Sequence, residues 1–299
     1  MKKAAVFMPL AAGACWGASG IFVRTLRAAD FNNITIMFSR AIVGVVLLFV
    51  FLIIHDRSLL RIRLCDLPVF LSAAINGYLL MNTCYNLTVE SLTLSLASVL
   101  LGLCPIFVLL LGAVFFREKI TPLKVSCMLT ALCGCMLISG VFDGTSDVAW
   151  SIAGIVTGLG SAFFNAIYTI NSKQLTERKY DVLTINLYVF MLTAACLLPF
   201  ADLSMIVDFV CSSSGGGTFG ILFFLAQALI TSVAPNYLYT TSIRYIDSSK
   251  AAILSCGAEP VSALILGIFI YREFPTFFSI LGMIITISAL VLLAKADRS

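Results

Sequence analysis

The sequence predicts an all-α polytopic membrane protein, whose helices cross the bilayer many times. Of its 299 residues, 60% are hydrophobic and only 11% are charged, whereas soluble domains carry about 25% charged residues. Apolar runs of roughly 20 residues follow one another along the chain, and each is long enough to cross about 30 Å of hydrocarbon as a helix. These runs are continuous, which excludes a transmembrane barrel, because barrel strands alternate apolar and polar residues.

Ten apolar runs predict ten transmembrane helices, separated by short linkers that carry charged or turn residues. Met1 to Lys3 leads directly into the first run, which predicts a retained signal anchor and not a cleaved signal peptide. The longest polar connection includes Cys211 to Gly217 and predicts a flexible loop. The predicted spans are residues 4–24, 32–54, 67–87, 93–116, 122–141, 150–172, 182–203, 218–242, 249–271 and 276–294.

The positive charges predict the orientation of these spans. With the amino terminus in the cytoplasm, Arg24, Arg27 and Arg272 fall outside, Arg40 lies within a span, and the other 15 of the 19 Lys and Arg residues face the cytoplasm. Cytoplasmic loops are enriched in Lys and Arg, so both termini are predicted to be cytoplasmic in a multi-pass protein of the cytoplasmic (inner) membrane. These loops explain the net charge of +4, and no nucleic-acid partner is predicted.

Two segments that lie 155 residues apart are similar, which predicts an internal duplication. Segment 97–121 reads ASVLLGLCPIFVLLLGAVFFREKIT, and segment 252–276 reads AILSCGAEPVSALILGIFIYREFPT. Nine of the 25 positions are identical, including both glycines, the proline and the Arg-Glu pair. Five spans per half is an odd number, so residues 1–145 and 146–299 are predicted to be five-helix repeats with inverted orientations. Inverted repeats are typical of secondary transporters, which bind substrate where the halves meet.

Two charged side chains lie inside predicted spans, where a charge is costly and points to a function. Glu259 lies near the middle of its span, next to Pro260, which leaves a backbone carbonyl near Cys256 without its helical partner. Three roles are open for Glu259: contact with a substrate amine, proton carriage, or a structural hydrogen bond or ion pair. Arg40 lies at a similar depth in the membrane. Four roles are open for it: an ion pair with Glu259, binding of a substrate carboxylate, hydrogen bonds to the carbonyls of a broken helix, or another structural role.

Polar side chains recur at helical spacing in the third, sixth and eighth spans, so one face of each of these helices points into the bundle. Such faces either hold helices together or line a water-filled cavity. Aromatic residues among them, with Trp16, would give a cavity apolar walls with polar tips, which suits an amino acid or an aromatic metabolite. Pro105 and Pro260 are predicted helix breaks or hinges. The predicted substrate cavity consists of Trp16, Arg40, Asn82, Tyr85, Asn165, Tyr168, Asn236, Tyr239 and Glu259.

Motifs for other chemistries are missing from the sequence. It contains no phosphate-binding loop and no HExxH or GxSxG motif, so neither ATP-driven pumping nor catalysis is predicted. The ten cysteines lie almost entirely in apolar runs and His55 is the only histidine, so the cysteines are predicted to be small buried residues, with no metal site and no cofactor. The alternatives are a passive channel or facilitator, a sensor subunit, and an intramembrane enzyme acting on lipid.

Segments 104–121 and 258–276 resemble the drug/metabolite transporter superfamily, specifically its EamA-type family. In that family, two copies of a five-helix unit each end in a Pro-containing helix, a Glu and a final Gly-containing helix. Asn165 stands where a tryptophan is common in the second copy. The resemblance covers nearly the whole chain. The matching positions are Trp16 to Ser19, Arg40, Pro105, Glu118 and Gly134 in the first copy and Pro260, Glu273 and Gly282 in the second.

The resemblance implies a ten-helix inner-membrane carrier, often an exporter of amino acids or other small metabolites. The substrate does not carry over, because members of the family differ in what they transport. We therefore predict a secondary transporter, not an enzyme, that moves a small organic metabolite by alternating access, with amino-acid export as the leading choice. The predicted partners are this substrate, protons as a candidate coupling ion, and the lipid bilayer. The chain is expected to be a monomer or a weak homodimer.

Overall fold

The computed structural model describes residues 5–92, 94–138, 151–212, 217–272 and 275–295, and these residues form helices and no strand. The α-helices are Phe7–Gly17 (α2), Ser19–Arg27 (α3), Asn33–His55 (α4), Leu67–Leu71 (α5), Leu80–Ser91 (α6), Leu94–Leu101 (α7), Cys104–Phe116 (α8), Pro122–Ile138 (α9), Ile152–Glu177 (α10), Val182–Leu197 (α11), Leu203–Ser212 (α12), Thr218–Ala228 (α13), Ala234–Ser242 (α14), Ser248–Tyr271 (α15) and Phe277–Lys295 (α16). Short 3₁₀ turns occupy Arg57–Leu60, Leu64–Asp66 and Leu198–Phe200.

The predicted all-helical, multi-span class is confirmed. Among the described residues, eight helical stretches are long and apolar enough to cross a membrane. The two other predicted spans contain no described helix of 18 residues or more. In the first span the described residues form α2 and α3, which are separated at Ala18, and in the fifth span residues 122–138 form the 17-residue α9, while residues 139–141 lie outside the described part of the chain.

Polar side chains cap the amino-terminal ends of several of these helices. The Asn32 side chain accepts a hydrogen bond from the Thr35 backbone N–H at 2.7 Å at the start of α4. Ser151 caps α10, and Asp181 caps α11. Each cap satisfies one of the backbone donors that the first turn of a helix leaves unpaired.

One helix differs from the prediction. The polar connection after the seventh span contains α12, and Cys211 and Ser212 belong to its last turn instead of to a loop. On one face of α12, Met205 and Phe209 pack against a cluster that contains Phe31 and Phe224. This apolar face explains the helix. Residues 213–216, also in the predicted loop, lie outside the described part of the chain.

Two spans contain a stretch of π-helix, a wider helical turn that is often found at functional sites. The first is Ser72–Leu79 (η3), before α6, and the second is Leu229–Val233 (η5), between α13 and α14. A shift of 155 positions places Ala74 to Tyr78 of η3 on η5. Helices α8 and α15 also end alike, since Arg117 and Arg272 both adopt the left-handed conformation with φ of 54°.

Glycines allow three pairs of helices to pack closely, because small residues let helix backbones approach each other. A Cβ on Gly13 or Gly17 of α2 would lie within 2.2 Å of α15 atoms. A Cβ on Gly158 of α10 would lie 2.4 Å from Leu100 of α7. Helices α9 and α16 cross at Gly134 and Gly282, where a Cβ on either glycine would overlap the other helix.

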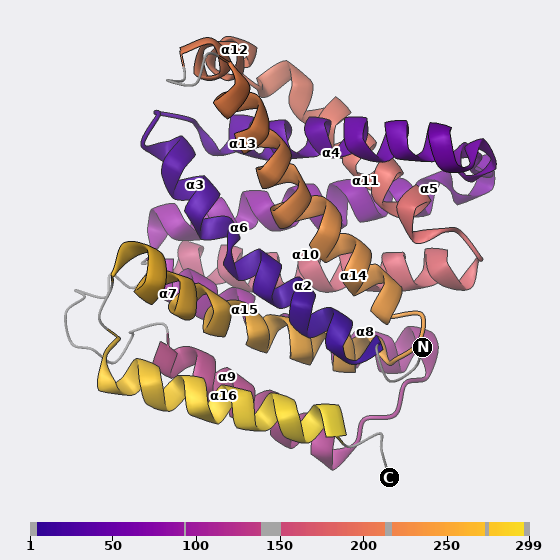
Figure 1. Cartoon of the computed structure of the whole chain (residues 1–299). Helices are drawn as coiled ribbons and strands as arrows, with labels where there is room; N and C mark the ends of the chain where they lie inside the picture. The colour runs from indigo at the N-terminus through magenta and orange to yellow at the C-terminus, as the bar shows by residue number, and fades with distance from the viewer. Residues whose placement is uncertain (1–4, 93, 139–150, 213–216, 273–274, 296–299) are drawn as a thin grey trace.

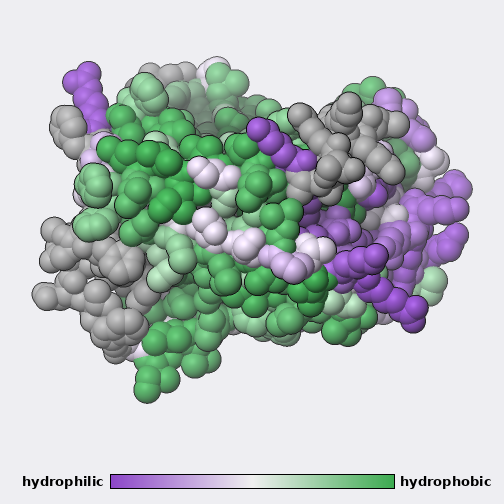
Figure 2. All heavy atoms as spheres, turned by 90° about the horizontal axis from the view of Figure 1, so that it is seen from below, coloured by the Kyte–Doolittle hydropathy of each residue, from purple (hydrophilic) through white to green (hydrophobic). Residues whose placement is uncertain are grey.

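The bundle has one hydrophilic end (Figure 2). In Figure 1, α2 begins and α16 ends on this side, and α8 and α10 also end there, whereas α15 ends on the opposite side. We call it the charged end, formed by the last turns of α4, α8 and α10 and the starts of α5, α9 and α15. Most of the remaining surface is apolar: Val114 is 75% and Phe269 is 79% exposed. Such exposure suits contact with lipid.

Candidate functional site

Buried polar and aromatic side chains meet near the middle of the bundle. The Tyr168 hydroxyl on α10 donates a hydrogen bond to Asn236 Oδ1 on α14 at 2.8 Å. The Tyr239 hydroxyl lies 2.9 Å from Thr169 Oγ1, and the Tyr239 ring lies 5.6 Å from the Trp16 ring. Helices from both predicted halves therefore contribute to one polar layer.

Arg40 on α4 extends this layer. Its Nη2 donates a hydrogen bond to Asn82 Oδ1 at 2.8 Å, and its guanidinium lies 5.7 Å from the centre of the Tyr78 ring. Tyr78 lies 6.3 Å from the ring of Tyr168, so a series of contacts joins Arg40 to Asn236. The Arg40 Nε is buried and has no hydrogen-bond partner among the described residues. Because buried donors are nearly always satisfied, this nitrogen is a candidate for binding a ligand.

Glu259 on α15 is half-buried, and no described residue donates a hydrogen bond to its carboxylate. Its backbone carbonyl accepts a hydrogen bond from Ser262 Oγ at 2.9 Å, and Gly17 of α2 packs directly on this turn. Within the described residues, no ion pair joins Glu259 to Arg40. The pairing that the sequence left open is thus absent from this arrangement.

The remaining predicted residues have looser placements. The Tyr85 hydroxyl lies 3.4 Å from Ser98 Oγ. Asn165 on α10 is half-buried, and its backbone carbonyl accepts a hydrogen bond from Thr169 Oγ1, whereas its side chain has no hydrogen bond to a described residue. Pro105 lies in the first turn of α8, whereas α15 continues through Pro260. A hinge at either proline stays a prediction.

A cavity of about 720 Å³ lies elsewhere, between α2, α15 and α16. Its lining is apolar and includes Leu10, Val261 and Leu290, with Lys295 at the end of α16. None of the nine predicted cavity residues lines it. The described residues also contain no group of three or more His, Cys, Asp and Glu side chains arranged to hold a metal ion.

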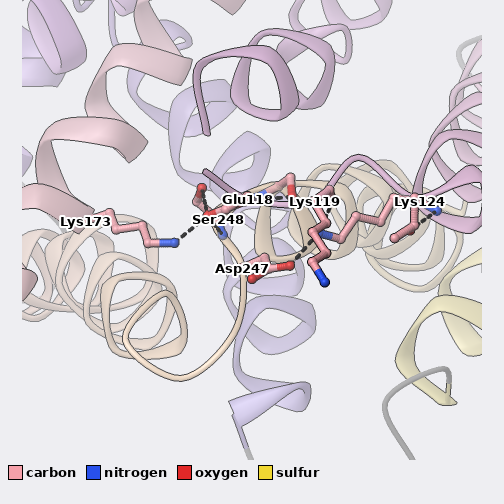
Figure 3. A network of polar contacts seen from close by, with 8 residues as sticks. Glu118, Lys119, Lys124, Lys173, Asp247 and Ser248 are labelled. Carbon is pink, nitrogen blue, oxygen red and sulfur yellow. Dashed lines mark hydrogen bonds and ion pairs between the residues drawn. The ribbon is translucent and has the colours of Figure 1, made fainter. Parts of the chain in front are cut away.

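A buried carboxylate that the sequence did not single out as a site accepts five hydrogen bonds from described residues. Glu118, just after α8, accepts hydrogen bonds from Lys173 Nζ of α10 and from the backbone and hydroxyl groups of both Ser248 and Ser249 at the start of α15. The Ser248 N–H and hydroxyl distances are 2.8 and 2.6 Å. Figure 3 shows Lys173 and Ser248 converging on the Glu118 carboxylate. We call this group the Glu118 clamp.

Charge and burial act in opposite directions on Glu118. Burial alone would raise the pKa of this carboxyl, but the hydrogen bonds from Lys173 and Ser248 and the Lys173 charge outweigh it and lower the pKa from 4.5 to about 2. Glu118 and Lys173 are each only 9% exposed. The clamp is therefore a buried ion pair with a permanently ionised carboxylate at neutral pH.

Two more ion pairs lie at the charged end. Lys124 of α9 pairs with Asp247, the residue before α15, and Lys124 Nζ also donates to the Lys119 carbonyl at 3.0 Å (Figure 3). Arg178, after α10, pairs with Asp66, before α5. Each of these pairs, like the Glu118 clamp, joins a residue before position 145 to a residue after it.

Comparison with known proteins gives a consistent set of similarities. The model of the EamA-like transporter family matches residues 3–140 and 152–295. An uncharacterized transporter of Archaeoglobus fulgidus is 30% identical over 78% of both chains. The uncharacterized inner membrane transporter YicL of Salmonella typhimurium is 27% identical over 97% of this chain and 94% of its own.

Two further similarities are more distant. The pseudopaline exporter CntI of Pseudomonas aeruginosa is 26% identical over 58% of this chain and 56% of its own. A solved structure described as a crystal structure of a protein superposes with a TM-score of 0.77 over 99% of both chains, at 15% identity. At that identity the superposition supports the fold alone.

Proposed function

The chain belongs to the EamA-like transporter family, and from this premise we propose that it is a secondary transporter that works by alternating access. A membrane transporter agrees with its multi-span helices and with the names of its relatives. The proposed cargo is a small organic metabolite, with an amino acid as the leading choice and export as the direction. The relative named as a pseudopaline exporter supports export of a small organic molecule.

We propose ten spans in two inverted five-helix halves, residues 1–145 and 146–299. Reciprocal packing supports this arrangement: α15 of the second half packs along α2, while α7 and α8 of the first half pack along α10. The matching π-helical stretches and the left-handed ends at Arg117 and Arg272 support it too. Two equivalent halves give two equivalent ways of opening the centre, one to each side of the membrane.

The charged end is the proposed cytoplasmic side. It carries the exposed residues Arg57, Arg61, Arg63 and Lys119, and Lys and Arg accumulate in cytoplasmic loops. The relative named as an inner membrane transporter supports a location in the cytoplasmic membrane. The start of α2 and the end of α16 lie on this side (Figure 1), which supports two cytoplasmic termini.

One observation carries the choice of substrate class: two opposite charges lie inside the spans without pairing with each other. Among the described residues, the Arg40 Nε has no hydrogen-bond partner and the Glu259 carboxylate receives no hydrogen bond. An amino acid carries a carboxylate for Arg40 and an ammonium group for Glu259, and its side chain would contact Trp16 and the tyrosines. Glu259 is also the candidate proton carrier, if transport is coupled to protons.

Counterflow in proteoliposomes tests this proposal. Vesicles preloaded with unlabelled amino acids should transiently accumulate a radiolabelled amino-acid mixture, because only a carrier exchanges substrate across the membrane. Arg40→Gln and Glu259→Gln should each lower the rate by roughly 10- to 100-fold, the loss expected for a charge-assisted hydrogen bond. Glu90→Gln, which alters an exposed carboxylate at the end of α6, should leave the rate unchanged.

Two results would reject parts of this account. Entry of label that preloaded amino acids do not accelerate would indicate a passive channel. Full counterflow in both Arg40→Gln and Glu259→Gln would remove these residues from the substrate site.

A further inference from the structure

The Glu118 clamp joins the two halves at a helix start. Asp247 occupies the N-cap position of α15 but makes no capping hydrogen bond, because its carboxylate pairs with Lys124 of the other half. Glu118 takes its place: it accepts from the Ser248 and Ser249 backbone N–H groups, which the first turn of a helix leaves unpaired. Helix α15, which carries Glu259, is thus capped by a residue of the first half.

Local backbone geometry directs Glu118 into this position. Arg117 adopts a left-handed conformation, which turns the chain back on itself, and the Glu118 N–H donates to the Gly112 carbonyl at 3.2 Å. A Cβ on Gly112 would lie 3.0 Å from Glu118 Oε2 and 3.1 Å from Ser248 Oγ. Gly112 therefore leaves the space that the carboxylate and the serine occupy.

We propose that Glu118 is a gating residue: its contacts with Lys173 and the start of α15 hold the charged end closed, and they must separate before the centre opens to that side. The proposal rests on the transporter function proposed above. Lys124–Asp247 and Arg178–Asp66 reinforce the closure, since both also join the halves. In this structure Glu118 and Lys173 are each only 9% exposed, so this end corresponds to the closed state in the proposal.

Ion pairs suit a closure that must be reversible. Moving two charges out of water costs nearly as much as their attraction returns, so the paired state and a separated, hydrated state differ little in free energy. Close apolar packing, in contrast, loses its full burial energy when water enters. A seam closed by Glu118, Lys173 and the serine hydroxyls can therefore separate at a small cost in free energy.

The rate at which a cysteine near the centre of the bundle reacts with a reagent added on the cytoplasmic side reports whether the charged end is open. The test introduces Asn165→Cys, on α10 between the two ends, and adds a membrane-impermeant maleimide to inside-out vesicles. Mass spectrometry of the peptide that contains position 165 then separates its labelling from that of the ten native cysteines. In this background Glu118→Gln should accelerate labelling from the cytoplasmic side by about tenfold or more, with no matching increase from the other side. Glu90→Gln, the same chemical change at an exposed position, should have no effect.

A milder variant covers the case in which Glu118→Gln does not fold. Ser248→Ala with Ser249→Ala removes two hydroxyl donors but keeps the backbone donors, so labelling should rise in the same direction by a smaller factor. Unchanged labelling in the folded variants would overturn the proposal. Equal acceleration from both sides would also overturn it, because that result indicates general loosening. Labelling needs no substrate, so the two proposals can fail separately. If Glu118→Gln accelerates labelling from the cytoplasmic side but no counterflow is measured, the carrier proposal is contradicted and the gating proposal stands.

Discussion

Two carboxylates, Glu118 and Glu259, illustrate what the sequence reveals at the scale of the residue. Glu259 was predicted as a site because a charge inside an apolar run is visible in the sequence itself. Glu118 belongs to the duplicated Arg-Glu motif, but its role depends on partners 55 and 130 residues away. Only the fold brings Lys173 and Ser248 to it. Arg40 is also predicted as a site residue, but the sequence leaves its partner open. The fold shows that Arg40 bonds to Asn82 and not to Glu259.

The Glu118 clamp predicts a defined pH dependence of stability. The folded pKa of Glu118, about 2, lies below its ordinary value of 4.5, so the ionised carboxylate stabilises the fold fully above about pH 4.5. That stabilisation is lost as the pH falls toward 2. In scanning fluorimetry, the unmodified protein should melt roughly 3–10 °C above Glu118→Gln at pH 8 and at pH 5.5.

The difference in melting temperature should shrink only below about pH 4.5. The groups that surround the carboxylate are Lys173 and the Ser248 and Ser249 donors, with Lys124 and Asp247 nearby. If the difference already disappears between pH 8 and pH 6, Glu118 titrates near neutrality and the buried ion pair is wrongly described.

At the scale of the element, the apolar runs predicted where helices lie better than how they end or bend. Helix α12 was missed because ten residues with a polar face do not resemble a span. The stretches η3 and η5 were missed because a π-helical turn changes hydrogen bonding without changing the apolar pattern. Gly13 and Gly17 lie four residues apart, so both lie on one face of α2, where each packs against α15.

The contact between α2 and α15 predicts unequal effects of two alanine substitutions in the first predicted span. In Gly17→Ala the new Cβ would lie 1.9 Å from Ser262 Oγ and 2.4 Å from the Glu259 carbonyl oxygen, so the helices must separate. Such overpacking typically costs about 1–3 kcal/mol, and the melting temperature should fall by several degrees. Gly20→Ala is the matched control, because nothing lies within 4 Å of its Cβ and alanine favours helix. Equal melting temperatures for the two variants would contradict this packing.

At the scale of the whole molecule, composition and spacing were enough to predict a multi-span helical membrane protein, and the resemblance of segments 104–121 and 258–276 indicated the EamA type. Hydrophobicity specifies which residues enter a membrane, and the duplicated segments indicate that the chain contains two related halves. Neither feature specifies which polar side chains meet. The seam between the halves at the charged end is therefore a property of the assembled fold, held by pairs such as Arg178 with Asp66.

Inversion of the two halves is the central claim, because two equivalent gates on opposite sides follow from it. Arg117 and Arg272 are exposed and occupy equivalent positions at the ends of α8 and α15. Arg117→Cys and Arg272→Cys, labelled in separate proteins with an impermeant maleimide and read by mass spectrometry, place each end on one side of the membrane. The account predicts that Cys labelling at position 117 occurs from the cytoplasmic side and at position 272 from the opposite side. Labelling of both positions from the same side would contradict it.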